Sequence, residues 1–169
     1  DGTATVTQDI VVTVNGTNDA PVLANNTITI DEGATLAITA DNISATDVES
    51  DALTFTVSDV IGGQFESTTD AGTAITSFTA ANIAASTVQF VHDGNEAAPS
   101  FKTVASDATL NSGAAASATV AFTNVNDAPE FNVVSGTALA DLSETQEEVF
   151  DFSTHVTDAE NNTVSYSAS

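Results

Sequence analysis

Basic residues are nearly absent from this chain. A single lysine, Lys102, stands against 24 acidic residues in a chain of 169, so the net charge is −23. Such a chain repels phosphate groups, which excludes nucleic acids and anionic membrane surfaces as partners. Strong acidity can also indicate disorder, but the hydrophobic content of 41% is arranged in alternating runs and predicts folded domains with acidic surfaces.

Cysteine is absent as well, which excludes disulfides, thiolate metal sites and cysteine nucleophiles. Tryptophan is missing and there is one Tyr, so aromatic capture of sugars is poorly supported. No apolar run approaches the ~20 residues of a membrane-spanning helix, and no signal peptide is recognisable. The chain begins and ends within a repeated pattern, and we expect an internal segment of a longer secreted polypeptide.

The sequence Asn-Asp-Ala-Pro occurs twice, at residues 18–21 and again 108 residues later at 126–129. Each copy follows a run of alternating apolar and polar side chains, residues 10–15 before the first copy and 118–123 before the second. Alternation with a period of two predicts a strand. A strand and a linker that recur at the length of a small β-domain predict a tandem array.

Short alternating runs separated by polar turns fill the chain between the two linkers. Their apolar positions are Ile28, Ile30, Leu36, Ile38, Leu53, Phe55, Val57, Phe65, Val88, Phe90, Phe101 and Val104. Residues 79–83 are compatible with one helical turn, and no longer helical pattern is present. Seven to nine short strands predict an all-β fold, an immunoglobulin-like Greek-key β-sandwich repeated in tandem. We expect four aromatic side chains in its core: Phe78, Phe90, Phe101 and Phe122.

The segment after the second linker repeats the opening of the middle segment. Residues 157–166 align with residues 46–55 at a spacing of 111 residues, which is consistent with small insertions. We therefore expect three parts. Residues 1–18 are the last strand of a preceding repeat plus a linker, residues 19–127 are a complete sandwich, and residues 128–169 are the first strands of a following repeat.

Carboxylates gather in turns that a sandwich brings to its two ends. Those of the complete repeat are Glu32, Asp47, Glu49, Asp93, Glu96 and Asp107. Oxygen ligands without nitrogen or sulfur suit calcium, which takes about six to eight of them. Without a cation, two carboxylates about 4 Å apart repel by roughly 1 kcal/mol in water and by several times more near a protein surface. The alternative is that Asn, Asp and Pro only form turns and that the acids are solvated.

Catalysis has little support in this sequence. His92 beside Asp93 suggests a dyad, but no activated serine or other nucleophile accompanies them, so we predict that the protein is not an enzyme. His155 has no partner pattern. Four matches to the glycosylation sequon, among them Asn161-Asn162-Thr163, carry no functional weight because a chain rich in Thr and Asn produces them by chance.

The order of acids and linkers resembles the cadherin superfamily: Glu, then Asp-x-Glu, Asp-x-x-Glu, Ala-x-Asp and Asn-Asp-x-Pro. Residues 77–83 and 88–94 resemble the chondroitin-sulfate-proteoglycan type of cadherin-like repeat. Residues 12–21 resemble the end of the VCBS-type repeats of large secreted bacterial adhesins. The resemblance covers nearly the whole chain and implies that calcium lies between consecutive domains.

The resemblance also implies which residues hold the calcium. At the first joint they are Asn18, Asp19, Asp47, Glu49 and Asp107. At the second joint they are Glu32, Asp93, Glu96, Asn124, Asn126, Asp127, Asp158 and Glu160. The first joint lacks the acids of a preceding repeat and is expected to bind more weakly in this chain.

The linkers depart from the animal cadherin pattern Asp-x-Asn-Asp-Asn-x-Pro. Gly16 and Asn124 stand where its first Asp would be, and Ala20 and Ala128 stand at or beside its last Asn. Each change removes an oxygen ligand, so we expect fewer ions per joint or lower affinity.

The function expected from this resemblance is mechanical. Tandem sandwiches stiffened by calcium would extend a large bacterial adhesin, secreted or on the cell surface, with neighbouring repeats of the same chain as partners. The alternative is that the repeats themselves bind one another or a polysaccharide during biofilm formation.

Overall fold

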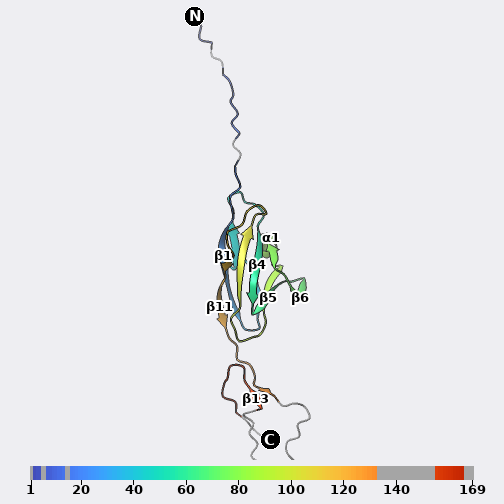
Figure 1. The fold of residues 1–169 in the computed structure, drawn as a ribbon. Helices are drawn as coiled ribbons and strands as arrows, with labels where there is room; N and C mark the ends of the chain where they lie inside the picture. Colours follow the sequence, from blue (N-terminus) through green and yellow to red (C-terminus); the bar gives the residue numbers. More distant parts are fainter. Residues whose placement is uncertain (1, 5–6, 14–15, 133–154, 166–169) are drawn as a thin grey trace, which may run out of the picture.

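The computed structural model describes residues 2–4, 7–13, 16–132 and 155–165. Residues 22–123 form an elongated β-sandwich, and the chain enters and leaves it at opposite ends (Figure 1). Its elements are β1 (Val22–Asp31), β2 (Thr35–Ala37), β3 (Ile43–Thr46), β4 (Thr54–Ile61), β5 (Gly63–Ser67), β6 (Asp70–Ala74), β7 (Ser77–Thr79), α1 (Ala80–Ala84), β8 (Val88–His92), β9 (Ser100–Ser106), β10 (Ala116–Ser117) and β11 (Thr119–Thr123). The predicted fold class, an all-β sandwich, is confirmed.

The sandwich has eleven strand segments where the sequence predicts seven to nine. One reason is the β5–β6 hairpin, which adds a short strand at the edge of a sheet. Another is that the last predicted strand, residues 118–123, is present as β11 and is preceded by a separate short strand, β10, which pairs with a different neighbour. Alternation along the sequence locates strands but does not show where one strand changes partners.

Strand β1 is the middle strand of a three-stranded sheet of order β11-β1-β3, and its two halves pair with different strands. Its first half runs antiparallel to β3, with Val22 opposite Thr46. A register shift after Leu23 bends the strand, and its second half runs parallel to β11, with Thr27 opposite Thr119. The other sheets have the orders β10-β9-β4-β7 and β2-β8-β5-β6. The first and last long strands of the repeat therefore lie side by side.

Aromatic rings fill the space between the sheets. The ring of Phe65 meets that of Phe101 edge to face at 4.9 Å between centroids, and meets that of Phe90 at 5.1 Å. Edge-to-face geometry places the positive edge of one ring against the negative face of the other. The core positions predicted for Phe78, Phe90 and Phe101 are confirmed, whereas Phe122 is half-buried at the border of the core.

The single helical turn predicted near residue 80 is present as α1 and is held by a capping box. Thr79 is the N-cap: its side chain accepts a hydrogen bond from the Asn82 amide at 3.1 Å. In return, the Asn82 side-chain oxygen accepts one from the Thr79 amide at 3.0 Å. These bonds satisfy backbone donors that a helix end leaves open. Among the described residues, no helix is long enough and apolar enough to cross a membrane.

Of the strand predicted for residues 10–15, the structure describes residues 10–13, and these form no strand. Residues 7–13 belong to no ladder, and Ile10, Val11 and Val12 are 83%, 88% and 76% exposed. Residues 14 and 15 lie outside the described part of the chain. A strand needs neighbours that satisfy its backbone groups, and no described strand lies beside this extended segment (Figure 1). The alternation is real, but it does not by itself make a strand.

Beyond the second linker, β12 (Glu130–Phe131) pairs antiparallel with β13 (Val156–Thr157). Glu130 is opposite Thr157, just as Val22 is opposite Thr46 in the sandwich. The pairing of β1 with β3 at the start of the sandwich therefore occurs again after the second linker. Residues 133–154, which fall within the predicted third part, lie outside the described residues.

Candidate metal sites at the two ends of the sandwich

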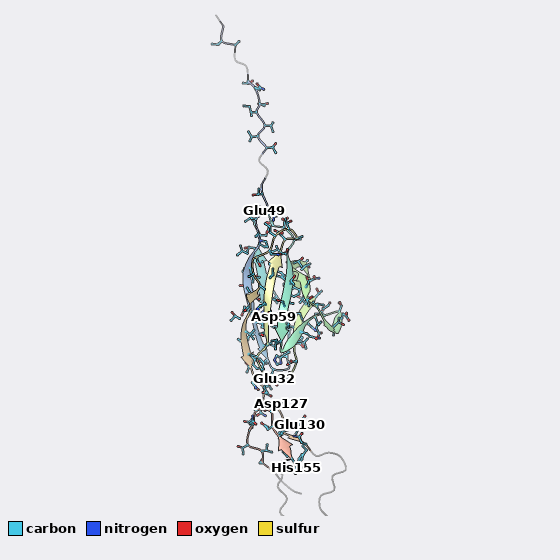
Figure 2. All side chains as sticks on the ribbon, in the orientation of Figure 1. Glu32, Glu49, Asp59, Asp127, Glu130 and His155 are labelled. Atoms are coloured by element: carbon cyan, nitrogen blue, oxygen red, sulfur yellow. The ribbon has the colours of Figure 1, made fainter. Side chains whose placement is uncertain are left out.

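The linker at the first joint is attached to the sandwich by side-chain hydrogen bonds. The Asn18 side-chain amide donates to Oδ2 of Asp107 at 2.8 Å. The Asp19 backbone amide donates to Oε2 of Glu49 at 3.2 Å. Pro21, which follows, is fully buried. Four of the five residues predicted for this joint are therefore joined pairwise at one end of the molecule, where Figure 2 labels Glu49.

Asp107 is saturated with hydrogen bonds. Its Oδ1 accepts from the amides of Thr109 and Leu110, each at 2.6 Å, and the residue is 7% exposed. The bonds from Leu110 and Asn18 lower the pKa of Asp107 and outweigh the opposing effect of burial. Asp107 therefore holds the loop after β9 and the linker together, which leaves its oxygens fewer free directions for a cation.

Asp47, the fifth predicted residue of the first joint, has one oxygen free. Its Oδ1 accepts from the Asp51 amide at 3.1 Å, within a turn in which Ser50 adopts a left-handed φ of 63°. Its Oδ2 is buried and has no hydrogen-bond partner. A buried carboxylate oxygen without a donor is costly in the absence of a cation.

Three carboxylates converge at the second joint. One oxygen each from Glu32, Glu96 and Glu160 lies within 4.8 Å of the others, and all three residues are half-buried. Glu32 follows β1, Glu96 lies in the loop after β8, and Glu160 follows β13, so the group includes both sides of the linker. The sequence predicted all three as ligands of one joint, and the fold brings them together.

The linker backbone and side chains reach the same carboxylates. The Val125 amide donates to Glu32 Oε2 at 3.0 Å, and the Asn124 side-chain amide donates to Oε2 of Glu96. The Asp127 amide donates to Glu160 Oε1 at 3.0 Å. The linker thus occupies the space between the carboxylates of the sandwich and the carboxylate of the following segment. Figure 2 shows Glu32, Asp127 and Glu130 gathered at this end.

Electrostatic repulsion at this joint contributes to raised pKa values of two carboxyl groups, those of Glu96 and Asp127. For Glu96, the hydrogen bond from Asn124 lowers the pKa, but burial and the charges of Glu160 and Glu32 raise it further, so the net shift is upward. Burial, followed by the charges of Glu32 and Glu160, raises the pKa of Asp127. The one lysine of the chain is not available here, because Lys102 pairs with Asp59 at 2.8 Å. The joint therefore concentrates negative charge without a basic side chain.

The two joints repeat the same hydrogen bonds. Asn18 donates to the carbonyl of its successor at 3.2 Å, and Asn126 does so at 3.0 Å. Asp158 Oδ1 accepts from the Asn162 amide at 2.7 Å, as Asp47 accepts from Asp51. The sequence alignment of the two segments is therefore matched by their local geometry.

Two features of the second joint differ from the sequence prediction. Asp93 lies outside the group of three: its Oδ1 accepts from the Asn95 amide at 3.0 Å, which closes a local turn. Asn162, which the prediction omitted, donates from its side chain to Asn126 Oδ1 at 2.7 Å. The two residues are 36 positions apart, and no sequence signal indicates their contact. A hollow of about 530 Å³ also opens beside this linker, lined by Asp127, Ala128, Glu130, Thr157, Asp158 and Ala159.

The donor set can be tested against a cation from the structure itself. Among the described residues, two buried side-chain oxygens lack a hydrogen-bond partner, Asp47 Oδ2 and Glu160 Oε2. One lies at each joint, and both belong to Asp-x-Glu motifs. The surrounding donors are carboxylate and amide oxygens, the ligands that calcium prefers. The residues therefore fit calcium.

The sandwich, with joints at both ends rich in carboxylates, defines a class of adhesion-type extracellular repeats. The chain belongs to the cadherin-like family: a sequence model of that family matches residues 21–122, more than half of the chain. No match was found among curated proteins or among solved structures. Cadherin-like domains are a non-enzymatic adhesion and structural fold, generally bind calcium and usually contact neighbouring repeats.

Proposed function

We propose that this chain is an extender segment of a large calcium-dependent bacterial adhesin, secreted or on the cell surface, in which calcium at the joints stiffens a tandem array of sandwiches. The observation that carries this proposal is the pair of buried, unpartnered oxygens, Asp47 Oδ2 and Glu160 Oε2. Each belongs to the repeat that follows a linker. A cation held there would therefore lie where one repeat meets the next.

Repulsion explains why such a joint needs a cation. Glu32 and Glu96 belong to the sandwich and Glu160 to the following segment, and their oxygens lie within 4.8 Å. Each such pair costs roughly 1 kcal/mol in water and several times more near a protein surface. The net repulsion acts between the two sides of the linker and separates them. Calcium supplies the positive charge that turns this repulsion into attraction.

The residues that would hold calcium follow from their positions. At the second joint they are Glu32, Glu96, Asn126, Asp127, Asp158 and Glu160, with Asn124 positioning Glu96. At the first joint they are Asp19, Asp47 and Glu49, with Asn18 and Asp107 attaching the linker. The second joint has ligands from both sides, so we expect it to bind more tightly than the first in this chain.

The same geometry supports a division of the chain at its linkers. We infer that residues 1–18 end one repeat, residues 19–127 form a complete one and residues 128–169 begin another. The supporting observation is that the β12–β13 pairing and the hydrogen bonds of Asn126 and Asp158 repeat those of β1–β3, Asn18 and Asp47. A tandem array with equivalent joints is what an extender requires.

Calcium titration of the chain after EDTA treatment tests the proposal. Isothermal calorimetry should detect calcium binding. Small-angle scattering should show that the chain samples a narrower range of overall lengths when calcium is added. Glu160→Gln should abolish the tighter binding event. The matched control is Asp70→Asn, which removes one charge from the exposed edge strand β6, away from both ends (Figure 1). The proposal would be contradicted if wild-type protein bound no calcium. It would also be contradicted if Glu160→Gln and Asp70→Asn changed calcium binding equally.

A further inference from the structure

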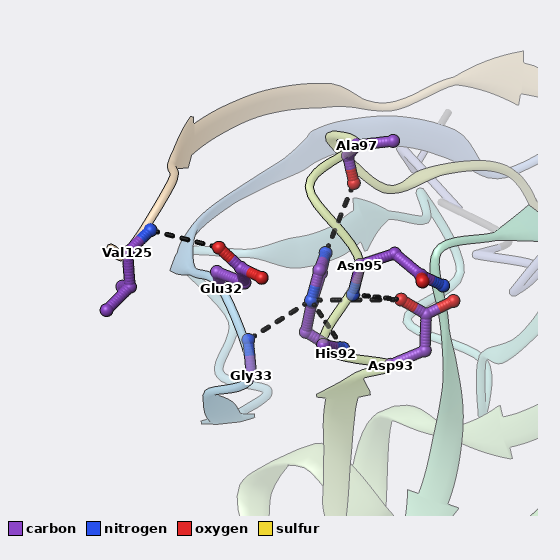
Figure 3. Close-up of polar contacts among 8 residues, drawn as sticks. Glu32, Gly33, His92, Asp93, Asn95, Ala97 and Val125 are labelled. Carbon is purple, nitrogen blue, oxygen red and sulfur yellow. Dashed lines mark hydrogen bonds and ion pairs between the residues drawn. The ribbon is translucent and has the colours of Figure 1, made fainter. Parts of the chain in front are cut away.

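His92 is a buried polar residue next to the second joint. Its side chain is fully buried, and its ring stacks on Phe122 with 5.0 Å between centroids and 26° between planes. It lies at the end of β8, directly before the loop that carries Glu96. Figure 3 shows it between the turn of Glu32 and the loop of Asn95 and Ala97.

Both ring nitrogens of His92 are used. Nδ1 accepts hydrogen bonds from the backbone amides of Gly33 at 3.2 Å and Gly94 at 3.1 Å. A nitrogen that accepts two N–H groups carries no proton, so Nε2 carries it and donates to the Ala97 carbonyl oxygen at 3.2 Å. The contact of 3.9 Å between Nδ1 and Asp93 Oδ1 is therefore not an ion pair. A fully buried ring with both nitrogens occupied has no free group for catalysis.

The partners of this ring are the neighbours of the candidate ligands. Gly33 follows Glu32, and Ala97 follows Glu96. Phe122, on which the ring stacks, belongs to the strand that leads to the linker and Val125. A single side chain therefore connects three segments: the turn with Glu32, the loop with Glu96 and the strand that enters the linker.

We propose that His92 is a positioning residue for the second joint: it fixes the distance between Glu32 and Glu96 and thereby sets the calcium affinity of that joint. This inference rests on the proposed function. A phenylalanine would fill the same space and keep the stack on Phe122. It would leave the Gly33 and Gly94 amides without an acceptor, and the two loops would lose their common anchor.

Two variants distinguish the role of the acceptor nitrogen of His92 from the role of its aromatic ring. His92→Phe keeps an aromatic ring and removes the acceptor, whereas His92→Asn removes the ring and keeps an amide oxygen near the position of Nδ1. The measurement is a calcium titration of the whole chain followed by amide NMR shifts. The amides of Gly33 and Val125 report the second joint, and those of Asp19 and Asp51 report the first, at the other end of the sandwich.

Removal of the acceptor should affect only the second joint. His92→Phe should raise the calcium dissociation constant there about tenfold or more, the usual effect of losing a residue that orients a metal ligand. The first joint should keep its wild-type value. The His92→Asn variant should bind calcium at the second joint more tightly than the His92→Phe variant does. If His92→Phe does not fold, His92→Leu replaces it in the comparison with His92→Asn, because Leu and Asn are similar in size.

The outcomes that contradict the inference are distinct. Folded His92→Phe with wild-type affinity at the second joint would overturn the positioning role alone. Equal weakening of both joints would show that His92 only stabilises the sandwich and would overturn it too. Wild-type protein that binds no calcium would overturn the proposed function, and the role of His92 in metal binding with it.

Discussion

The side-chain amide of Asn18 donates a hydrogen bond of 2.8 Å to the carboxylate of Asp107, a residue 89 positions later in the chain. The same carboxylate accepts two backbone amides of its own loop. The linker is therefore attached to the repeat that follows it without any metal. In the ion-free state, motion at the first joint should therefore be concentrated in the residues that precede Asn18.

Removal of this bond should release the linker. We expect Asn18→Ala in EDTA to lower the heteronuclear ¹⁵N relaxation values of the Asp19 amide to those of a flexible segment. Loss of a hydrogen bond to a charged group should also lower the unfolding midpoint, by about 6 °C or more. Thr17→Ala is the control, because Thr17 is exposed and adjacent. Equal relaxation values in Asn18→Ala and wild type would contradict the attachment.

Acidity should affect the metal-free second joint through Glu96 and Asp127, whose pKa values are raised. A folded state that holds protons more tightly than the unfolded chain is most stable below the ordinary carboxyl pKa, and this stability is lost as pH rises through the raised values. In EDTA, contacts between Asp127 and Glu160 should therefore become more ordered as pH falls towards the carboxyl range. Calcium should have the opposite pH dependence: protons compete with it for the carboxylates, so its affinity for the joint should decrease as pH falls. A pH titration of the side-chain carboxyl ¹³C chemical shifts, with and without calcium, gives the pKa values of Glu96 and Asp127 in each state. Raised pKa values that persist in saturating calcium would contradict this account.

Gly63, the first residue of β5, should accept no side chain. A Cβ there would lie 2.4 Å from the Val91 carbonyl oxygen and 2.6 Å from the ring of Phe90. Relief of such contacts requires the β5–β8 pairing to shift, so Gly63→Ala should lower the free energy of unfolding by about 3 kcal/mol. Gly72→Ala is the matched control: Gly72 also has a positive φ, of 85°, but a Cβ there has no atom within 4 Å, so the control carries the backbone strain without the steric contact. Denaturant unfolding that shows equal losses for both variants would contradict the steric explanation.

The capping box of α1 should contribute measurably to stability although the helix has only five residues. Thr79→Ala removes the side-chain oxygen that the Asn82 amide contacts, and should cost about 1 kcal/mol of unfolding free energy. Calcium affinity at either joint should stay unchanged, because α1 lies on the flank of the sandwich (Figure 1). Urea unfolding measures this loss, and Ser77→Ala, at an exposed position of β7, is the control.

The convergence of three carboxylates at the second joint agrees with the sequence pattern. Glu32 directly follows β1, whereas Glu96 and Glu160 lie in the loops that follow β8 and β13, and such loops meet at the poles of a sandwich. Their assignment to one joint came from the resemblance to cadherin-like repeats, and the structure places one oxygen of each within 4.8 Å of the others. The core positions of Phe78, Phe90 and Phe101 were equally predictable from alternation.

Other features depend on competition that a sequence pattern does not show. The carboxylate of Asp93 is taken by the Asn95 amide, and that of Asp107 by three donors, so an acid in the right turn is not always a free ligand. The strand predicted near Val12 needed a partner that alternation cannot supply. The bond from Asn162 to Asn126 joins two segments whose separation in sequence hides their contact.

The parallel pairing of β1 with β11 has a consequence for tension. A pull on the two linkers draws β1 towards its beginning and β11 towards its end, so the two strands must slide lengthwise past each other. The paired positions from Thr27 and Thr119 to Asp31 and Thr123 are then loaded together instead of one after another. Rupture must break these contacts in a single step, and the rate of forced unfolding is set by that step. The arrangement resists force along the axis on which the chain enters and leaves.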